Sequence, residues 1–275
     1  MPLTKLYCTN CKLEPVDIEQ YKGGCDCVPP AIVELIRKNL KGSYHHGTNV
    51  SASVLTGCLR KTYLERTNDY ANSLEAEYWM IRGSLIHQVF EGYSPDWECE
   101  QTYFKTLPNG QKVYGTVDAY HPETQTLVDY KSCADEAFMF FKGKPKPDHV
   151  FQTNVYRWLL HGGTDERGST VIKPVDNIVI WYIAMKRCVR TGGKYSVREG
   201  FGAKKQLVEY QMEPVPIIDV EPWIIERSKI MEKAFGKGKM PPMLVKEELW
   251  RCKICPVKAL CDAYEQRAYN ERTEK

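Results

Sequence analysis

Apolar side chains recur every three or four positions in five stretches of the chain, a period that predicts helices with one buried face. The expected helices cover residues 32–40, 51–66, 73–91, 148–161 and 218–235. Strand-like sequence lies between the third and the fourth of them. Residues 102–107 and 111–119 flank Pro108-Asn109-Gly110, which predicts a β-hairpin because Asn-Gly supplies the positive φ angles of a tight turn.

Three further strands complete the expected sheet. Residues 126–131 follow the hairpin, 178–185 form a short apolar run typical of a buried strand, and 205–212 alternate as an outer strand does. Blocks of helices and strands therefore follow one another along the chain, which is the order of an α/β domain with a mixed sheet. We expect helices to flank that sheet.

The composition is that of an ordinary globular protein. The 275 residues, 43% hydrophobic and 27% charged, correspond to roughly two units of about 150 residues each. No apolar stretch approaches the roughly 20 residues of a membrane span, and Cys8 and Cys11 stand where a secretory signal would have its apolar core. We therefore expect a cytoplasmic protein with no membrane partner. The net charge of +3 is too small to indicate a nucleic-acid ligand by itself.

Two aspartates and a lysine are expected to meet on neighbouring strands. Asp118 lies on the second strand of the hairpin, and Asp129 and Lys131 share one face of the next strand because residues i and i+2 point the same way. Two converging carboxylates repel each other unless a cation neutralises them, and such oxygen ligands suit Mg²⁺ or Mn²⁺. The alternative for any isolated Asp-x-Lys is a solvated, charged strand face.

Two helices contribute further polar side chains. His87 follows Arg82-Gly83-Ser84-Leu85-Ile86 on the helix before the hairpin. Gln152 and Tyr156 stand four residues apart, and thus on one face, on the helix after the third strand. Taken alone, His87 is typical of a helix histidine whose hydrogen bonds are satisfied within the protein. Tyr156 taken alone is typical of a residue that packs in a core.

Taken together, these residues resemble a known family. Arg-Gly-x3-His, Gly-x2-Asp, Asp-x-Lys and Gln-x3-Tyr, in this order, are similar to the motifs of the PD-(D/E)XK nuclease superfamily in its RecB-like branch, and the resemblance spans about residues 50–262. It implies a restriction-endonuclease-like mixed sheet flanked by helices. Asp129 opens the Asp-x-Lys motif at a position where the family more often has Glu. The definition of the motif allows this substitution.

The resemblance also implies roles for individual residues. The implied metal ligands are His87, Asp118, Asp129 and the backbone carbonyl of Tyr130. Lys131 would act at the attacking water, while Gln152 and Tyr156 would orient that lysine and the nucleic-acid strand.

Four of the eleven cysteines lie near the amino terminus, in a segment too short for its own core: Cys8, Cys11, Cys25 and Cys27. In a reducing compartment clustered thiols are more often metal ligands than disulfides. They predict a zinc-ribbon-like module over residues 1–29, followed by the nuclease domain over 30–275. His45 or His46 could replace a cysteine as ligand, and the alternative is a tail with free thiols.

Three more cysteines are closely spaced near the carboxyl end, as Cys252-x2-Cys255-x5-Cys261. Three thiolates need a fourth ligand, and four-cysteine sites hold either zinc or an iron-sulfur cluster, a choice that spacing alone does not make. The AddB subunit and the CRISPR adaptation nuclease of the RecB-like branch combine this spacing with one distant upstream cysteine around a four-iron four-sulfur (4Fe-4S) cluster. Cys58 stands where that upstream ligand should be.

The resemblance thus implies an iron-sulfur segment at the carboxyl end, with one cluster bound by Cys58, Cys252, Cys255 and Cys261. Zinc and unligated thiols are the alternatives. The remaining cysteines with no metal-ligand spacing are expected to be small buried side chains: Cys99, Cys133 and Cys188.

These expectations converge on a metal-dependent deoxyribonuclease that hydrolyses phosphodiester bonds as an exonuclease on single-stranded DNA ends. The resemblance implies work in CRISPR adaptation, or in recombination and repair of viral or mobile-element DNA, with the proteins of those processes as partners. A homo-oligomer is compatible with the sequence. One rival is a non-catalytic iron-sulfur module that binds DNA on a nuclease scaffold, and another is a zinc-cluster adaptor.

Aromatic and basic side chains could line a path for the strand. The candidates for stacking and phosphate contacts are Tyr63, Tyr78, Trp79, Arg60, Lys61 and Arg82. At helical spacing such aromatics more often belong to a core, and Arg60 and Lys61 could equally be ordinary surface charges.

Overall fold

The structure is a computed structural model. It describes residues 3–20, 30–42, 48–92, 95–134, 144–185, 188–191, 194–197 and 207–273. The chain divides into two compact units, and each is described by itself. The first unit consists of Met1–Asn49, Gly57–Ile81 and Arg227–Lys275, and the second of Val50–Thr56 and Arg82–Glu226. Helices α4 (Leu74–Gly92) and α7 (Ile217–Lys237) contribute residues to both.

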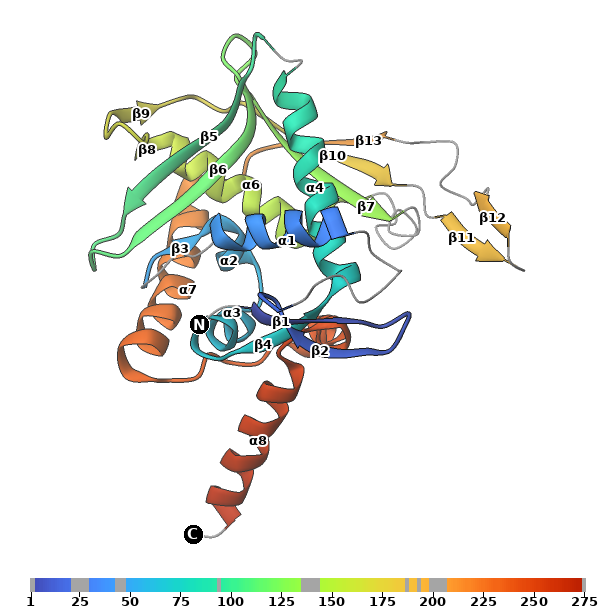
Figure 1. Ribbon diagram of the computed structural model, residues 1–275. Coiled ribbons are helices and arrows are strands. Elements are labelled where there is room, and N and C mark those ends of the chain that lie inside the picture. The colour runs from blue at the N-terminus through green and yellow to red at the C-terminus, as the bar shows by residue number, and fades with distance from the viewer. Residues whose placement is uncertain are drawn as a thin grey trace. The chain divides into compact units, whose positions relative to one another are not determined.

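The second unit is built on an eight-stranded sheet (Figure 1). Its strands are β3 (Val50–Ser51), β5 (Glu98–Thr106), β6 (Lys112–His121), β7 (Thr126–Ala134), β8 (His161–Thr164), β9 (Thr170–Ile172), β10 (Asn177–Met185) and β13 (Leu207–Met212). They follow the order β13-β10-β7-β6-β5-β8-β9, with β3 paired to β6. Because β7 and β10 run parallel while β6 and β7 run antiparallel, the sheet is mixed, as the sequence predicts.

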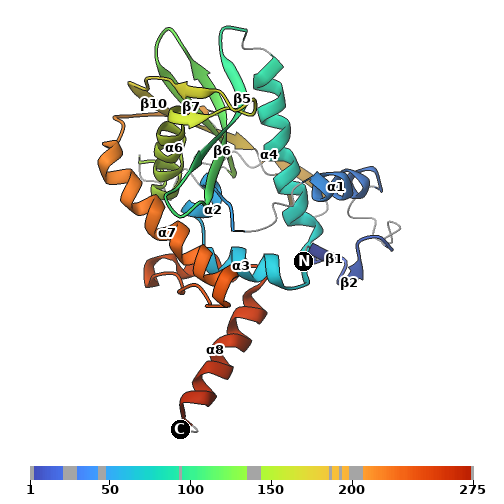
Figure 2. The ribbon, with the colours of Figure 1, turned by 90° about the vertical axis from the view of Figure 1, so that its left-hand side faces the viewer.

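Helices cover this sheet on both sides. Figure 2 shows α6 (Pro147–Leu160) on one side of the strands and the carboxyl-terminal part of α4 on the other. The side chains of α6 that are fully buried include Val155, Leu159 and Leu160, and the short helix α2 (Ala52–Thr56) packs against α6. On the α4 side, Phe90 packs against a core cluster that contains Tyr130. The expected mixed sheet flanked by helices is therefore confirmed.

The predicted hairpin forms around the Asn-Gly turn. Its strands β5 and β6 pair from Glu98 and Tyr120 to Thr106 and Lys112. Gly110 has φ +82, and its N–H donates a 2.9 Å hydrogen bond to the carbonyl of Leu107. The predicted strands at 126–131, 178–185 and 205–212 correspond to β7, β10 and β13, with the last at the sheet edge as expected.

The first unit contains a small sheet and four further helical segments. Strands β1 (Leu3–Cys8), β2 (Leu13–Asp17) and β4 (Tyr70–Ser73) pair in the order β2-β1-β4. The helical segments are α1 (Pro30–Gly42), α3 (Leu59–Thr67), the 3-10 helix η1 (Lys246–Ile254) and α8 (Lys258–Thr273). Leu6 of β1 shares one core cluster with Ile36 of α1 and Leu74 of α4. Apolar side chains on both sides of residue 29 thus pack together.

The prediction of one helix over 51–66 is wrong, because Gly57 and Cys58 separate α2 from α3. Cys58 has the extended backbone of a helix N-cap, with φ −80 and ψ 106, and its Sγ accepts a hydrogen bond from the Lys61 N–H at 3.4 Å. The apolar period continues through the break, so periodicity alone did not reveal it.

Two elements complete the description. Within the part of the chain that the structure describes, strands β11 (Cys188–Thr191) and β12 (Lys194–Val197) pair with each other and with no other strand. Among the described residues, no helix combines the length and the apolar character that crossing a membrane requires.

Candidate active site

Asp118 is held by the backbone of the neighbouring strand. The ladder between β6 and β7 ends at the Ala119–Val128 pair. Beyond it, the Tyr130 N–H donates a buried 2.7 Å hydrogen bond to Oδ2 of Asp118. A backbone donor bonded to a carboxylate fixes the orientation of that carboxylate, which leaves Oδ1 to face other groups.

Asp129 and Lys131 project from β7 together, as their spacing predicts. Lys131 Nζ lies 2.7 Å from Oδ1 of Asp129, whose side chain is 0% exposed. Oδ2 of Asp129 is buried and has no hydrogen-bond partner among the described residues. Because an unsatisfied buried carboxylate oxygen is costly, this atom calls for a cation or a proton beside it.

Burial and the charge of Asp129 both disfavour ionisation of Asp118. Burial raises the pKa of Asp118 to about 7, with a further contribution from the charge of Asp129. Burial raises the pKa of Asp129 as well, although Lys131 opposes this. Two ionised carboxylates are both hydrogen-bond acceptors, so the pair needs a shared proton or a cation. Lys131 supplies one positive charge: burial lowers its pKa, but Asp129 and Asp118 raise it by more.

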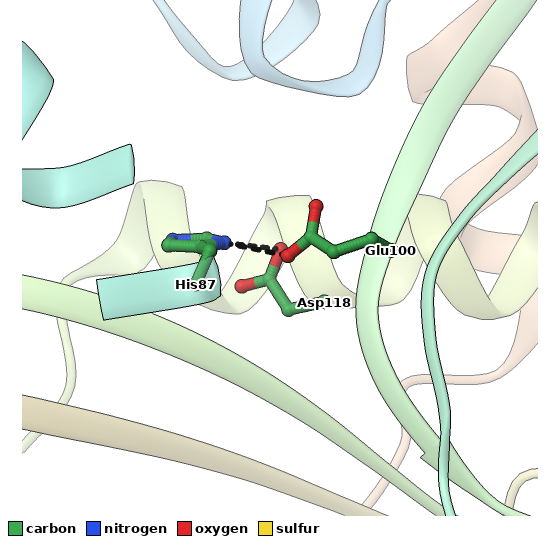
Figure 3. Close-up of side chains that lie close together, drawn as sticks. All are labelled: His87, Glu100 and Asp118. Atoms are coloured by element: carbon green, nitrogen blue, oxygen red, sulfur yellow. Dashed lines mark hydrogen bonds and ion pairs between the residues drawn. The ribbon is translucent and has the colours of Figure 1, made fainter. Parts of the chain in front are cut away.

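His87 reaches the same carboxylates from α4. Figure 3 shows its Nδ1 facing Glu100 and Asp118, 2.9 Å from Oε1 of Glu100 and 3.6 Å from Oδ1 of Asp118. The hydrogen bond to Glu100 raises the pKa of His87 in spite of its partial burial. Across the part of the chain that the structure describes, these three residues form the one group of His, Cys, Asp or Glu whose ligand atoms all lie within 4.8 Å of one another.

Sequence reasoning did not identify Glu100. It stands on β5 between Cys99 and Gln101, which pair with Ala119 and Val117 of β6. Glu100 therefore lies across the hairpin from Asp118. It belongs to none of the motifs described above, but counting back from the Asn-Gly turn in register would have found it.

Gln152 and Tyr156 meet on α6. The Gln152 Nε2 amide donates a 2.6 Å hydrogen bond to the Tyr156 hydroxyl, and Tyr156 is buried. Its ring fills the space where a Cβ of Gly115 would be, since an added Cβ there would lie 2.7 Å from the ring. Burial raises the pKa of Tyr156 far above its usual range, with the charges of Asp118 and Asp129 adding to the effect. The glycine of the Gly-x2-Asp motif thus admits the tyrosine of the Gln-x3-Tyr motif.

The donor set fits a divalent cation. Carboxylate oxygens are the ligands of Mg²⁺ and Mn²⁺, and an imidazole nitrogen is compatible with Mn²⁺. The unpartnered Oδ2 of Asp129 and the three ligand atoms of His87, Glu100 and Asp118 are the groups that such an ion would satisfy. The predicted residues His87, Asp118, Asp129 and Lys131 are brought together within the second unit.

The cysteines of the predicted cluster gather in the first unit. Cys58 caps α3, Cys252 lies in η1, Cys255 follows it and Cys261 lies in α8. Burial raises the pKa of the Cys58 thiol, and the neighbouring Cys252 and Cys261 raise it further. Among the described residues, these cysteines do not form a group whose ligand atoms lie close enough together to hold a metal ion.

Arg60 is a buried cation beside these cysteines, which excludes the surface role considered from the sequence. It is 7% exposed, and its Nε donates a 2.7 Å hydrogen bond to the carbonyl of Pro241. Its Nη1 forms an ion pair with Glu265 and lies 3.7 Å from Sγ of Cys261. The guanidinium is therefore occupied within the protein.

The other members of the predicted strand path differ in exposure. Tyr63 packs against Phe235, with ring centroids 5.4 Å apart, and Lys61 pairs with Glu65 at 3.5 Å. Tyr78 and Trp79 on α4 are exposed, and Arg82 is half-buried. Their role toward DNA stays a prediction.

Only half of the predicted zinc-ribbon ligands are described. Cys8 is buried at the end of β1, where its Sγ donates a 3.5 Å hydrogen bond to Oε1 of Glu75, and Cys11 is exposed in the turn that follows. Cys25 and Cys27 lie outside the described residues, as do His45 and His46.

The cysteines without metal-ligand spacing are placed in part. Cys99 is buried in a core cluster with Tyr130, as expected. Cys133 is half-buried and lies 3.7 Å from the carbonyl of Ile183. The side chain of Cys188 lies outside the described residues.

No family model and no curated protein sequence matches the chain. Among solved structures, the protein SSO0001 is similar with a TM-score of 0.56 and 16% identity, covering 88% of this chain and 98% of its own. A phage-related exonuclease from Haemophilus somnus 129PT gives a TM-score of 0.34 at 15% identity, covering 75% of this chain and 80% of that one. The alkaline exonuclease LHK-Exo from Laribacter hongkongensis gives 0.40 at 11% identity, covering 69% and 91%. The TM-scores of the two exonucleases lie below 0.5 and do not establish a common fold. The match to SSO0001 shows a shared fold.

Proposed function

We propose that the chain is a metal-dependent deoxyribonuclease that hydrolyses phosphodiester bonds. The observation that carries this proposal is the buried carboxylate of Asp129, which has no partner for Oδ2 although Asp118 and Lys131 lie beside it. Such an arrangement costs free energy unless a cation is bound there. A merely structural charge cluster has no need of two buried carboxylates that oppose each other.

The residues that would hold the ion are His87, Asp118, Asp129 and the backbone carbonyl of Tyr130. A bound Mg²⁺ or Mn²⁺ would polarise the scissile phosphate and lower the pKa of a bound water. The Tyr130 N–H keeps Asp118 in position through its 2.7 Å hydrogen bond. Burial of Asp129 keeps bulk water away from the same point.

Lys131 would act at the attacking water, which it would orient or deprotonate. In the chain without a metal ion, burial lowers its pKa, but Asp129 and Asp118 raise it by more. A protonated amine can donate hydrogen bonds to the attacking water and to a phosphate oxygen, which orients the first and stabilises the charge that develops on the second. Asp129 fixes its position through the 2.7 Å contact.

Tyr156 and Gln152 form the support beneath these groups. The hydroxyl of Tyr156 stays protonated because burial and the nearby carboxylates hold its pKa far above the usual range. It is therefore a hydrogen-bond donor while it accepts from Gln152. In the proposal this pair orients Lys131 and the nucleic-acid strand.

The finer features of the proposal rest on the family resemblance. The substrate is single-stranded DNA, degraded from its ends, and the process is CRISPR adaptation or the recombination and repair of viral or mobile-element DNA. The partners are the proteins of that process.

A nuclease assay tests the proposal directly. Single-stranded DNA labelled at one end should be degraded in the presence of Mg²⁺ or Mn²⁺ and remain intact with EDTA. The variants Asp118→Ala and Lys131→Ala should retain the fold, measured by circular dichroism, and lose cleavage. DNA that is bound but not cut by the wild-type chain in Mn²⁺ would instead support the rival, a non-catalytic binding module.

The four late cysteines are proposed to hold a 4Fe-4S cluster. The Cys-x2-Cys-x5-Cys spacing with a distant upstream cysteine carries this proposal, and the influence of Cys252 and Cys261 on the pKa of the Cys58 thiol supports it. A brown protein with broad absorption near about 400 nm is the expected result for cysteine-ligated iron. A colourless protein with zinc in its place would contradict the cluster and favour the zinc alternative.

The amino-terminal module, residues 1–29, is proposed to bind one zinc ion through Cys8, Cys11, Cys25 and Cys27. Deletion of these residues should remove about one zinc per chain and leave the iron content unchanged. A truncated chain that keeps its zinc would place that metal elsewhere.

A further inference from the structure

Glu100 lies inside β5 with a backbone conformation that strands do not use. Its φ is +51, in the left-handed region, while Cys99 and Gln101 on either side are paired with β6. For a residue other than glycine this backbone conformation is strained. Such strain persists where the surrounding structure needs the side chain in one place.

That place is the space between His87 and Asp118. Oε1 of Glu100 and Oδ1 of Asp118 both face Nδ1 of His87, at 2.9 and 3.6 Å (Figure 3). One ligand atom from each residue lies within 4.8 Å of the other two. Ligand atoms on opposite sides of a Mg²⁺ ion are about 4.2 Å apart, so small side-chain rotations would bring all three atoms to a single ion.

A carboxylate beside a histidine in a metal site can have either of two roles. In the positioning role it accepts a hydrogen bond from the ring nitrogen that faces away from the metal, and thereby fixes the tautomer. In the ligand role it lies on the same side of the ring as the other ligands. Glu100 contacts the nitrogen that also faces Asp118, and this geometry corresponds to the ligand role.

We propose that Glu100 is a direct ligand of the catalytic cation, together with His87 and Asp118. The proposal rests on the metal-dependent nuclease proposed above and adds a carboxylate that belongs to none of its sequence motifs. Glu100 is thus a catalytic residue whose position is determined by the hairpin register and by its left-handed backbone.

The test is the affinity for Mn²⁺ in the absence of DNA, measured on the full chain by titration with the electron paramagnetic resonance signal of free Mn²⁺ as the readout. Glu100→Gln keeps the size of the side chain and an oxygen that can accept from His87, but it removes the charge. We expect it to weaken Mn²⁺ binding by at least about 10-fold, because the number of ligand charges sets the affinity of such sites, and Glu100→Ala to weaken it at least as much. The matched control is Glu123→Gln, an exposed position in the turn between β6 and β7, which should bind Mn²⁺ as the wild type does.

The two substitutions separate the two roles. Normal affinity in Glu100→Gln together with lost affinity in Glu100→Ala would show that Glu100 only positions His87, and normal affinity in both would show that it does not act on the metal; either result overturns the proposal. Thermal unfolding in EDTA should show a single cooperative transition in both variants, so that a loss of Mn²⁺ affinity is not a loss of the fold. A wild-type chain that neither binds Mn²⁺ nor cleaves DNA would contradict the proposed function itself.

Discussion

The carboxylate site and the cysteine site are built from the chain in opposite ways. The carboxylates and Lys131 lie on paired strands between residues 98 and 134, where register alone brings them together. The four cysteines come from three segments, and Arg60 beside Cys58 is separated by 201 positions from its contact Cys261. The first site is preorganised by the sheet, whereas the proposed cysteine site would depend on ligands from distant segments. We therefore expect loss of a carboxylate to affect activity, and loss of a cysteine to affect stability.

The largest expected effect is on cleavage by Asp118→Asn. Removing a group that acts on the metal-bound phosphate should lower the cleavage rate by roughly 10²- to 10³-fold or more. The fold should persist, because Asn keeps an oxygen that can accept from the Tyr130 N–H, and iron content should not change. Initial rates on end-labelled DNA measure the effect, with Glu123→Gln as the control. Cleavage close to the wild-type rate would remove Asp118 from the site.

The converse variant is Cys58→Ser. Serine is a good N-cap and can accept a hydrogen bond from the Lys61 N–H as Cys58 does, so α3 should keep its cap while the proposed cluster loses a ligand. We expect iron to be released and the thermal midpoint to fall by roughly 5–10 °C, the shift that about 2–3 kcal/mol produces in a chain of this size. Mn²⁺ affinity of the carboxylate site should remain.

The control for this variant is Cys133→Ser, a half-buried cysteine in β7. It should keep iron and stability, because serine can donate to the Ile183 carbonyl as the thiol does. If Cys133→Ser bleached the protein while Cys58→Ser did not, the fourth ligand of the cluster would be misassigned.

A third variant tests the support of the carboxylate site. In Gly115→Ala the new methyl group would lie 2.7 Å from the Tyr156 ring, which must shift. Overpacking of this kind costs about 1–3 kcal/mol, and displacement of Tyr156 should also reduce cleavage. Gly236→Ala is the matched control, since a Cβ at this position of α7 meets nothing within 4 Å. Unfolding in denaturant compares the two variants, and equal stabilities would contradict the close packing.

The carboxylate site and the cysteine site also differ in how well the sequence predicts them. Five of the eight strands of the large sheet were predicted, from their alternating or apolar sequence and the Asn-Gly turn: β5, β6, β7, β10 and β13. The meeting of Asp118, Asp129 and Lys131 followed from strand geometry. Glu100 was missed because its role depends on register across the hairpin rather than on a motif. Strands β8 and β9 were missed as well: Gly163 fits there because a Cβ would lie 2.3 Å from the carbonyl oxygen of Leu159, a contact that exists only after folding.

The break at Gly57 and Cys58 and the burial of Arg60 have a similar cause. From the sequence, Arg60 could be an ordinary surface charge, because Arg and Lys side chains usually are exposed. In the structure the carbonyl of Pro241 and the carboxylate of Glu265 bind it, and both come from the far end of the chain. Local pattern carries no information on partners at that distance, so the sequence predicts the sheet site better than the cysteine site.

The smallest expected effect is the pH dependence of stability in the metal-free chain. Burial, followed by the charge of Asp129, raises the pKa of Asp118 to about 7, above the value near 4 of an unfolded aspartate. The folded chain therefore binds more protons than the unfolded chain between these values, and the free energy of unfolding falls as pH rises from about 4 to about 7. His87 adds the same sign: its pKa is raised by the hydrogen bond to Glu100, so its contribution is present at low pH and is lost as pH rises through the raised value.

Thermal midpoints in EDTA between pH 4.5 and 7.5 measure this slope. Asp118→Asn has no proton to release at this position, so its slope should be shallower than that of the wild type, and at pH 7.5 the variant should be the more stable of the two. Adding Mn²⁺ at pH 7.5 should raise the midpoint of the wild type and leave that of the variant nearly unchanged, because the cation replaces the proton between the carboxylates. Cys58→Ser should lower the midpoint at every pH and leave the slope as it is. Equal slopes in Asp118→Asn and the wild type would mean that Asp118 is ionised in the folded chain without a cation, and the stability of the sheet site would then not depend on the opposition of its charges.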